Sequence, residues 1–342
     1  ELSPTALAVL TAVSVVTMLG GALFALAADD LKRVLAWSTV SQLALMFAAL
    51  SLGGYGAGVL HLLSHGAFKA LLFLAAGSVI HAVGTQRLDE MGGLRTSMPW
   101  TFATTSVGLA ALAGVPPLVG FFSKDAVLGV AADEAVHGDA VRGWLVLVVG
   151  MVTTGLTAAY CVRAWLMVFF GPRRSRSVAP VSESPVVMVA PLSVLAVASV
   201  VGGAAVVRPQ FLGVDADPVH LWVMVTSVLV IAAGGAFVAA EWSRLARSDP
   251  AAALGPARPW LARELRYDAL VGAAVVRPTW WASRATAAGE SDVIDAYVRG
   301  AGTGTHWGAR MLRWLHDGDV QHYVTAIVLG AVTVAVIVGV VQ

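Results

Sequence analysis

The chain has 342 residues, of which 58% are hydrophobic and only 13% are charged, and its mean hydropathy is +0.78. A soluble domain carries roughly a quarter charged residues, so this composition indicates a polytopic membrane protein. The formal net charge of +1 gives no reason to expect a nucleic-acid partner. A single cysteine, Cys161, excludes a disulfide framework and a cysteine metal site.

Eight membrane spans are expected from the runs of apolar residues. About 20 such residues cross the hydrocarbon core of a bilayer as a helix. On this measure the chain is an all-α protein with spans near residues 5–27, 34–53, 56–83, 99–131, 143–170, 186–207, 219–240 and 321–341.

The fourth predicted span, 99–131, is too long for one straight crossing, and Gly114, Pro116 and Pro117 interrupt it. Proline lacks a backbone N–H and its ring clashes with the preceding helical turn. We therefore expect two half-helices joined by an unwound segment. Such joints occur in membranes only where protein or trapped water satisfies the freed backbone groups, and they commonly mark ion sites.

Charges in the loops predict the orientation. Loops on one side of the membrane carry seven basic residues: Lys32, Arg33, Arg87, Arg95, Arg173, Arg174 and Arg176. The loops on the other side carry two basic residues among five acidic ones: Arg142, Arg208, Asp133, Glu134, Asp139, Asp215 and Asp217. Cytoplasmic loops are enriched in Lys and Arg, so the first side is expected to be cytoplasmic and both chain ends to lie outside the cytoplasm. Residue 1 is glutamate, and we expect the chain to be the C-terminal part of a longer protein.

The segment 241–318 differs from the spans because tryptophan and arginine alternate along it. Its members include Trp242, Trp260, Trp280, Trp281, Trp307, Trp314, Arg244, Arg258, Arg277 and Arg310. These residue types favour the headgroup boundary of a bilayer. We expect an amphipathic lateral helix on the cytoplasmic membrane face, bent or broken at Pro278, Gly289 and the glycines 300, 302 and 304. It is either a simple connector or a strap that binds neighbouring subunits.

Two histidines and a lysine recur at helical spacing in the third span. The run HLLSHGAFKALLF covers residues 61–73 and places His61, His65 and Lys69 at i, i+4 and i+8, on one face of a helix. An ionisable group inside a membrane is a functional candidate by default. Imidazole titrates near neutral pH, and a buried lysine releases its proton more readily than an exposed one. The three residues are therefore candidates for proton transfer; the alternative is a polar helix–helix contact.

A second intramembrane lysine, Lys124, follows the predicted joint, and Asp125 is next to it in the run GVPPLVGFFSKD over 114–125. A charge near the end of a half-helix can be stabilised by the helix dipole and by unpaired backbone groups. An exposed lysine–aspartate pair at a helix end is the alternative. We favour the buried site because the sequence after Asp125 stays apolar through residue 132.

Other polar side chains of the spans could extend a proton path or could support helix packing. Span two carries Ser38, Thr39, Ser41 and Gln42 near its cytoplasmic end. Their side chains could hold water, or could form interhelical hydrogen bonds. Arg163 lies about two turns from the cytoplasmic end of span five. Its side chain either snorkels to the interface or pairs with an internal carboxylate that the sequence does not identify.

Together, three runs resemble a known family. They are DLKRVLAWSTVSQ over 30–42, the His61/His65/Lys69 frame and GVPPLVGFFSKD over 114–125. They are similar to the antiporter-like subunits of respiratory complex I and to the large subunits of multi-subunit sodium/proton antiporters. Within this group, the segment before the last span, with Tyr267-Asp268 and Val293-Ile294-Asp295, resembles the lateral helix of the L subunit of NADH-quinone oxidoreductase.

The resemblance implies a fold of inverted five-helix repeats, each with a broken helix and a central lysine. It implies that Lys69 is the central lysine of the second repeat, His61 and His65 its relay, and Lys124 the terminal lysine near the outer exit. On this basis we expect residues 1–170 to form the membrane domain that carries this repeat. Two further transmembrane helices would follow in 171–240, then the lateral helix in 241–318 and the last span in 319–342.

This sequence departs from the family pattern at three places. The upstream repeat, with its glutamate and lysine pair, is absent from this sequence. Ala126 follows Asp125 where the family often has glutamate, so an acidic partner at that point is not implied. Gly66 stands where alanine is usual, which loosens the helix slightly.

The function implied by the resemblance is proton translocation by a non-redox subunit of NADH:quinone oxidoreductase. The chain has no dinucleotide fingerprint, phosphate loop or iron–sulfur cysteine pattern. We therefore expect no cofactor in this chain, and NADH, FMN, iron–sulfur clusters and quinone in partner subunits. The expected partners are other membrane-arm subunits, contacted by the lateral helix, and lipid, in a bacterial inner membrane. The alternatives are a subunit of a sodium/proton antiporter and a structural anchor of a membrane arm.

Overall fold

The structure, a computed structural model, describes residues 3–174, 181–206, 220–316 and 318–341. Its regular structure is helical, and no strand occurs in these ranges. The prediction of an all-α membrane protein is therefore confirmed. The chain divides into two compact units, the first ending at Arg266 and the second beginning at Tyr267, and each is described by itself.

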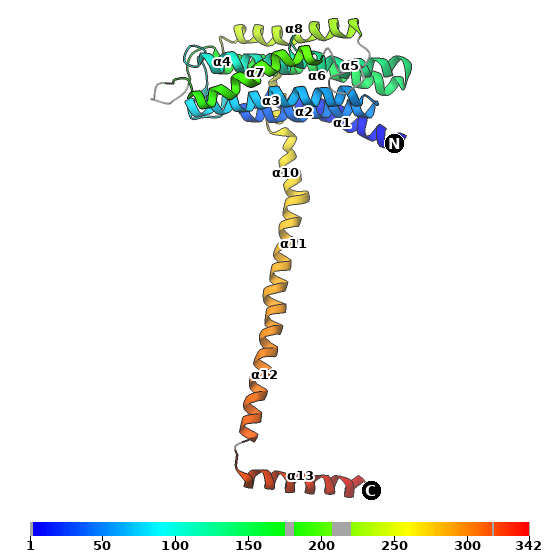
Figure 1. Ribbon diagram of the computed structural model, residues 1–342, viewed down its shortest axis with the longest axis vertical. Helices are drawn as coiled ribbons and strands as arrows, with labels where there is room; N and C mark the ends of the chain where they lie inside the picture. The colour runs from blue at the N-terminus through cyan, green and yellow to red at the C-terminus, as the bar shows by residue number, and fades with distance from the viewer. Residues whose placement is uncertain (1–2, 175–180, 207–219, 317, 342) are drawn as a thin grey trace. The chain divides into compact units, whose positions relative to one another are not determined.

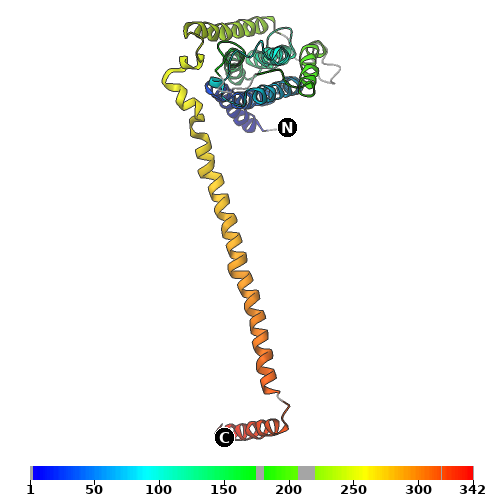
Figure 2. The same cartoon turned by 90° about the vertical axis from the view of Figure 1, so that its left-hand side faces the viewer.

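The first unit is a helical bundle in which α1 to α8 lie roughly parallel or antiparallel to one another (Figure 1). Figure 2 shows α7 and α8 at different edges of this bundle. The helices are α1 (Pro4–Ala27), α2 (Leu31–Ser51), α3 (Tyr55–Val83), α4 (Pro99–Ala113), α5 (Val119–His137), α6 (Ala140–Phe169), α7 (Val186–Val206) and α8 (Leu221–Arg244).

Short polar residues fix where several of these helices begin. The side chains of Ser3, Asp30 and Asp139 each accept a hydrogen bond from a backbone N–H in the first turn of α1, α2 and α6, at 3.0 to 3.2 Å. Such caps satisfy N–H groups that have no partner inside the helix. Pro4 and Pro99 occupy first-turn positions of α1 and α4, where a missing N–H costs nothing.

Seven of the described helices are long and apolar enough to span a membrane: α1, α2, α3, α6, α7, α8 and α13. They correspond to seven of the eight predicted spans. The remaining predicted span, 99–131, is divided into α4 and α5, so the predicted broken helix is confirmed as a feature of the fold. The second half of this span continues to His137, six residues beyond the predicted end at 131.

The break is built from a left-handed glycine and a close crossing. α4 ends at Ala113, and Gly114 has φ 89°, a conformation that favours glycine. Pro116 and Pro117 lie in the joint, and α5 begins at Val119. A Cβ on Gly120 would lie 1.8 Å from the Ala111 carbonyl oxygen, so only glycine lets α5 pass α4 this closely.

Loops predicted to share the cytoplasmic side do meet in the structure. The N–H of Leu31 donates to the Gln86 carbonyl, and the N–H of Leu88 donates to the Asp29 carbonyl, both at 2.9 Å. The loop after α6 joins them, because the Gly93 N–H donates to the Phe170 carbonyl at 3.2 Å. Four of the charges used for the sidedness prediction lie outside the described residues: Arg176, Arg208, Asp215 and Asp217.

The segment predicted as one lateral helix over 241–318 is divided in the structure. Residues 241–244 complete α8, and 250–266 form short turns (η3, Pro250–Ala257; α9, Arg258–Ala262; η4, Glu264–Arg266) that belong to the bundle unit. Glu264 fastens residues 250–266 to α2, since it accepts hydrogen bonds from Arg33 and, at 2.6 Å, from Trp37 Nε1. The long helix therefore starts at Tyr267, about 26 residues later than predicted.

The second unit is a long helix followed by an apolar one. The long helix comprises α10 (Tyr267–Val271), α11 (Arg277–Ala288) and α12 (Asp295–Leu315), joined by π-helical stretches at 272–276 and 289–294. Gly289 begins the second stretch and Pro278 follows the first, but the glycines 300, 302 and 304 lie inside α12 without interrupting it. A break at these three glycines is therefore wrong, while a bend there stays a prediction. The last helix, α13, spans Val320–Val341, and the placement of the long helix on a membrane face stays a prediction.

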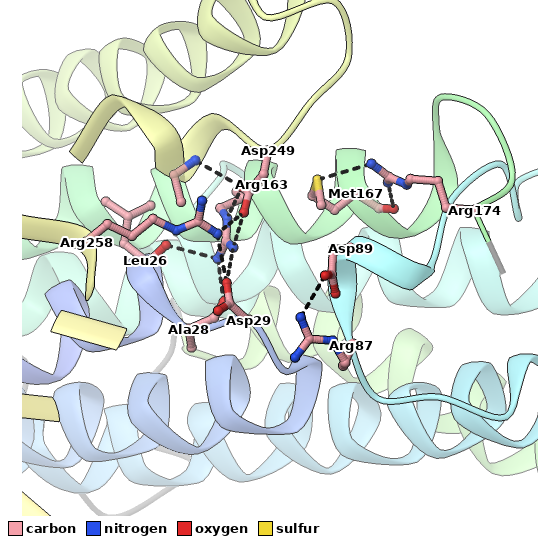
Figure 3. A network of polar contacts seen from close by, with 11 residues as sticks. Leu26, Ala28, Asp29, Arg87, Asp89, Arg163, Met167, Arg174, Asp249 and Arg258 are labelled. Carbon is pink, nitrogen blue, oxygen red and sulfur yellow. Dashed lines mark hydrogen bonds and ion pairs between the residues drawn. The ribbon is translucent and has the colours of Figure 1, made fainter. Parts of the chain in front are cut away.

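Arg163 pairs with Asp249, the carboxylate that the sequence alone did not identify. It is 1% exposed and makes a two-pronged contact with Asp249, with Nε to Oδ1 at 2.7 Å and Nη2 to Oδ2 at 2.8 Å (Figure 3). Its Nη1 donates to the carbonyls of Leu26 and Ala28 at the end of α1, at 3.0 and 2.7 Å.

Arg258 closes this network on its open side. Its Nη2 donates to Asp249 Oδ2 at 2.5 Å and to Asp29 Oδ1 at 2.8 Å (Figure 3). Asp249 also caps the turn that follows it, accepting from the Ala251 N–H at 3.0 Å. The network therefore fastens the segment after α8 to the end of α1 through the last two turns of α6.

We expect Arg163→Ala to lower the free energy of unfolding by about 3 kcal/mol, because it removes the two-pronged partner of Asp249 and leaves two buried carbonyls without a donor. The measurement is the thermal unfolding of the purified chain in detergent. Arg142→Ala is the matched control, since Arg142 pairs with Asp139 where both side chains are partly exposed, and such pairs contribute less than about 1 kcal/mol. Equal losses in the two variants would contradict the assigned role of Arg163.

The same network predicts a pH dependence. Burial by itself would raise the pKa of Asp249, but the hydrogen bonds and charge of Arg163, and then Arg258, outweigh it and hold that pKa below its ordinary value. The ionised Asp249 carboxylate therefore contributes its full stabilisation at pH values above the ordinary aspartate pKa of about 3.9. This stabilisation is lost as the pH falls through the lowered pKa of the folded protein. We expect the stability deficit of Asp249→Asn to be constant from about pH 8 to about pH 5 and to shrink below about pH 4. A deficit that grows on acidification would contradict this sign.

Candidate functional site

The residues predicted on one face of the third span are all buried in the bundle. His61 is fully buried, and His65 and Lys69 are each 5% exposed. The ring centroids of His61 and His65 lie 6.3 Å apart, as expected for neighbours at i and i+4 of α3. His65 also makes an edge contact with Phe68, with centroids 5.4 Å apart. α3 therefore carries a continuous titratable stripe into the core.

The Lys69 ammonium is held by α2. Its Nζ donates to the Leu35 carbonyl at 3.0 Å and to Ser38 Oγ. Ser38 Oγ in turn donates to the same Leu35 carbonyl at 2.8 Å. Lys69 is thus solvated by neutral oxygens, and it has no ion pair with a described carboxylate.

His61 is fixed from both ring nitrogens. Its Nε2 lies 3.1 Å from Gln42 Oε1 on α2, and its Nδ1 lies 3.0 Å from Ser123 Oγ on α5. With the Gln42 carbonyl oxygen facing it, Nε2 carries the proton, so Nδ1 accepts from the Ser123 hydroxyl. A neutral imidazole therefore joins α2, α3 and α5 at one point.

Lys124 uses the end of the broken helix as its ligand. It is 2% exposed, and its Nζ donates to the carbonyls of Leu112 and Ala113, the last two residues of α4, at 3.0 and 3.3 Å. In an unbroken helix those carbonyls would accept from the N–H groups four residues later, at Pro116 and Pro117. Proline has no N–H, so the two prolines remove the donors that would compete with Lys124.

Asp125 faces α8 instead of its sequence neighbour. Its Oδ1 accepts from Ser227 Oγ at 2.8 Å, and the described ion pairs include none between Asp125 and Lys124. Asp125 Oδ2 and His65 Nε2 are buried and have no hydrogen-bond partner within the described residues. Buried polar atoms of this kind usually bind ordered water.

The remaining predicted polar residues divide into two groups. Ser38 and Gln42 contact the lysine and histidine of α3 directly. Thr39 donates to the Leu35 carbonyl of its own helix at 2.9 Å, and Ser41 donates to the Met18 carbonyl of α1 at 2.7 Å. These two serve helix packing. Arg163 belongs to the anchoring network described above.

Two further residues of the site were not predicted. Ser123 bridges to His61, and Ser227 brings α8 to Asp125. Ser123 precedes Lys124 in the run that was singled out, so its position was a usable signal. Ser227 lies in an ordinary apolar span, and nothing in its local sequence distinguishes it.

The arrangement is a chain of exchangeable groups between two buried lysines. Lys69 and His65 are separated by one helical turn, His65 neighbours His61, and His61 bonds to Ser123, the residue before Lys124. Neutral imidazole can accept a proton at one nitrogen and release one from the other. The site can therefore hold and relay protons, given water at the unbonded polar atoms.

Comparison with known proteins identifies the group. A family model described as "NADH:quinone oxidoreductase/Mrp antiporter, TM" matches residues 1–157, which include α2 to α5, the helices that hold Lys69 and Lys124 and their hydrogen-bond partners. NADH-quinone oxidoreductase subunit L of Mycobacterium tuberculosis is 36% identical over 362 aligned residues, covering 100% of this chain and 56% of the relative.

Two other relatives agree. Subunit L of the same enzyme from Rickettsia bellii is 40% identical, over 59% of this chain and 31% of the relative. NADH-ubiquinone oxidoreductase chain 5 of Marchantia polymorpha is 39% identical, over 59% of this chain and 30% of the relative. The chain spans about half the length, or less, of the curated relatives that it matches.

The fold also matches a solved structure. A chain in the structure of the Mrp complex from Dietzia sp. DQ12-45-1b superposes with a TM-score of 0.56 at 24% identity, covering 96% of this chain and 33% of that one. This likeness concerns the fold alone. From the family match and the subunit L relatives, the chain belongs to the antiporter-like transmembrane family of NADH:quinone oxidoreductase and Mrp antiporter subunits.

Proposed function

We propose that this chain is the proton-translocating, non-redox part of an L-type subunit of NADH:quinone oxidoreductase in a bacterial inner membrane. The observation that carries the proposal is the buried row of Lys69, His65 and His61 on α3, whose last member bonds to Ser123, the residue before the buried Lys124. The similarity to subunit L proteins along the whole chain supports it.

In the proposed cycle, Lys69 takes a proton from the cytoplasmic side, where α2 supplies the Leu35 carbonyl and Ser38. His65 and His61 pass a proton toward Ser123 and Lys124, which releases it on the outer side. In the resting tautomer the Nδ1 of His61 accepts from Ser123. Transfer toward Ser123 therefore uses the other tautomer, in which Nε2 takes up the incoming proton and the Nδ1–H donates to Ser123, and the resting tautomer must be reset before the next transfer. Reorientation of Gln42 and Ser123 would allow that reset.

The energy must come from elsewhere. Moving one elementary charge outward against 100 mV requires about 2.3 kcal/mol. Quinone reduction in partner subunits, which would hold NADH, FMN and the iron–sulfur clusters, is the proposed source. The partners would include antiporter-like membrane-arm subunits contacted by the long helix of 267–315.

A sodium/proton antiporter subunit is the second candidate, favoured by the shared fold with the Mrp complex of Dietzia sp. DQ12-45-1b. The same lysines would serve, with an ion gradient as the energy source. Gentle purification through a C-terminal tag separates the two: inhibitor-sensitive NADH:quinone activity that co-purifies supports complex I. A particle of membrane subunits alone, without NADH oxidation, supports the antiporter. A structural anchor is the third candidate, and normal pumping by a Lys69→Ala, Lys124→Ala double variant would favour it.

We expect Lys124→Ala to lower proton pumping and coupled NADH turnover at least about tenfold, because a lost buried donor leaves the path without its terminal carrier. Pumping is measured by fluorescence quenching in inverted membrane vesicles, and assembly by native gel. The chain has three lysines, and the third, Lys32, is exposed at the start of α2. Lys32→Ala is therefore the matched control and should pump normally. A normal proton-to-electron ratio in assembled Lys124→Ala complexes would refute the role.

We expect Ser123→Ala to lower pumping by about fivefold to tenfold, since an unpaired buried nitrogen costs about 1 kcal/mol or more. The Nδ1 of His61 would lose its donor, and Ser123→Thr should restore most of the pumping. Thr39→Ala is the control, because that hydroxyl bonds only within its own helix. If Ser123→Ala and Thr39→Ala pump equally well, His61 is not relaying through Ser123.

A further inference from the structure

A hollow of about 610 Å³ lies where α6 and α8 end, and neither Lys69 nor Lys124 lines it. It is lined by Phe170, Gly171, Trp242, Ser243, Ala246 and Arg247. α6 and α8 pack together and end on the side where the basic loops meet. The hollow therefore lies at the expected cytoplasmic boundary of the membrane, with aromatic rings and polar groups in one wall.

The backbone of this wall is strained in a way that places Arg247. Ala246 and Arg247 have φ of 49° and 65°, two consecutive left-handed residues that are not glycine. Such conformations cost free energy and persist where the surroundings require them. The turn is held by the Arg247 N–H, which donates to the Trp242 carbonyl at 2.9 Å. A Cβ on Gly171 would lie 3.9 Å from Arg247 Cβ, so the side chain starts at the floor of the hollow.

The charge around the hollow is positive. The Arg247 guanidinium is exposed and has no ion pair or hydrogen bond to a described residue. The Arg174 guanidinium lies 5.9 Å from the centre of the Trp242 ring. The acidic groups near it in the sequence are already paired: Glu241 with Arg244 at 3.0 Å, and Asp249 with Arg163 and Arg258. An anion in the hollow would meet an uncompensated arginine next to a tryptophan.

α8 offers a track for a hydrocarbon chain below the hollow. Its exposed face is lined by small residues that lead, one turn at a time, to the hollow: Ala232, Ala236, Ala239, Ala240 and Ser243. An exposed apolar face of a membrane helix lies against lipid acyl chains. The hollow and the track together match the two ends of one amphipathic molecule.

We propose that this hollow binds the phosphate of an anionic membrane phospholipid, with Arg247 as its charged ligand and Trp242 as its floor. Basic pockets between helices on the cytoplasmic side bind lipid headgroups by the same chemistry. Arginine holds phosphate through two parallel hydrogen bonds. The site is independent of the proton-transfer proposal, because binding does not require turnover.

The test is native mass spectrometry of the full-length chain, delipidated and titrated separately with phosphatidylglycerol and phosphatidylcholine. We expect one tightly bound phosphatidylglycerol, with about tenfold preference over phosphatidylcholine, and about tenfold weaker binding in Arg247→Gln. Arg284→Gln is the matched control, because Arg284 also lies beside a tryptophan, 5.5 Å from the Trp280 ring centre, but does not line this hollow. It should bind like the wild type.

Three results would overturn the proposal. The first is equal affinity for the two lipids, and the second is an Arg247→Gln variant that binds phosphatidylglycerol like the wild type. The third is displacement of the lipid by millimolar inorganic phosphate, which would show a free-anion site. Because Arg247→Gln changes an exposed side chain, we expect the variant to fold normally. Thermal unfolding in detergent, as proposed for Arg163→Ala, checks that the fold is kept.

Discussion

A positive charge inside a bilayer has to be solvated by protein, because hydrocarbon supplies no dipoles in place of water. Lys69, Lys124 and Arg163 are buried in the bundle, and each donates to backbone carbonyls of another helix. For Lys124 and Arg163 those carbonyls lie at helix C-termini, which carry unpaired oxygens and the negative end of the helix dipole. The C-terminal ends of α4 and α1 therefore supply the carbonyl oxygens that solvate Lys124 and Arg163.

The broken span follows from this requirement. A helix that continued through 114–118 would consume the carbonyls of its last turn, and Lys124 would have no ligand. Pro116 and Pro117 remove the competing N–H groups, while Gly114 turns the chain and Gly120 lets the next half-helix cross closely. Four residues that look only like helix breakers thus build a cation site. Their effect on Lys124 joins local backbone chemistry to the proposed exit of the proton path.

Local sequence predicted the parts of the site that depend on composition and spacing. The stripe on α3 follows from a period of 3.6, and the break follows from the backbone chemistry of proline. Contacts between distant segments could not be read in this way. Asp249 lies 86 positions from Arg163, and Ser227 lies 102 from Asp125, so only the packing of α6 and α5 against later segments brings them together. The lateral-helix boundary was missed for the same reason, since Glu264 joins the turns after α8 to α2.

The ligands of the buried cations separate transport from anchoring. Arginine cannot lose its proton in a protein, and Arg163 is locked to the carboxylate of Asp249 in a two-pronged pair, which suits a permanent fastening. A lysine held by a carboxylate would likewise be fixed in its charged form. Lys69 and Lys124 instead contact neutral oxygens, which solvate an ammonium without making its deprotonation prohibitive. The same carbonyl chemistry therefore holds all three charges. Arg163 keeps its proton whatever its partner, and the two lysines, which have no carboxylate partner among the described residues, are the ones proposed to release theirs.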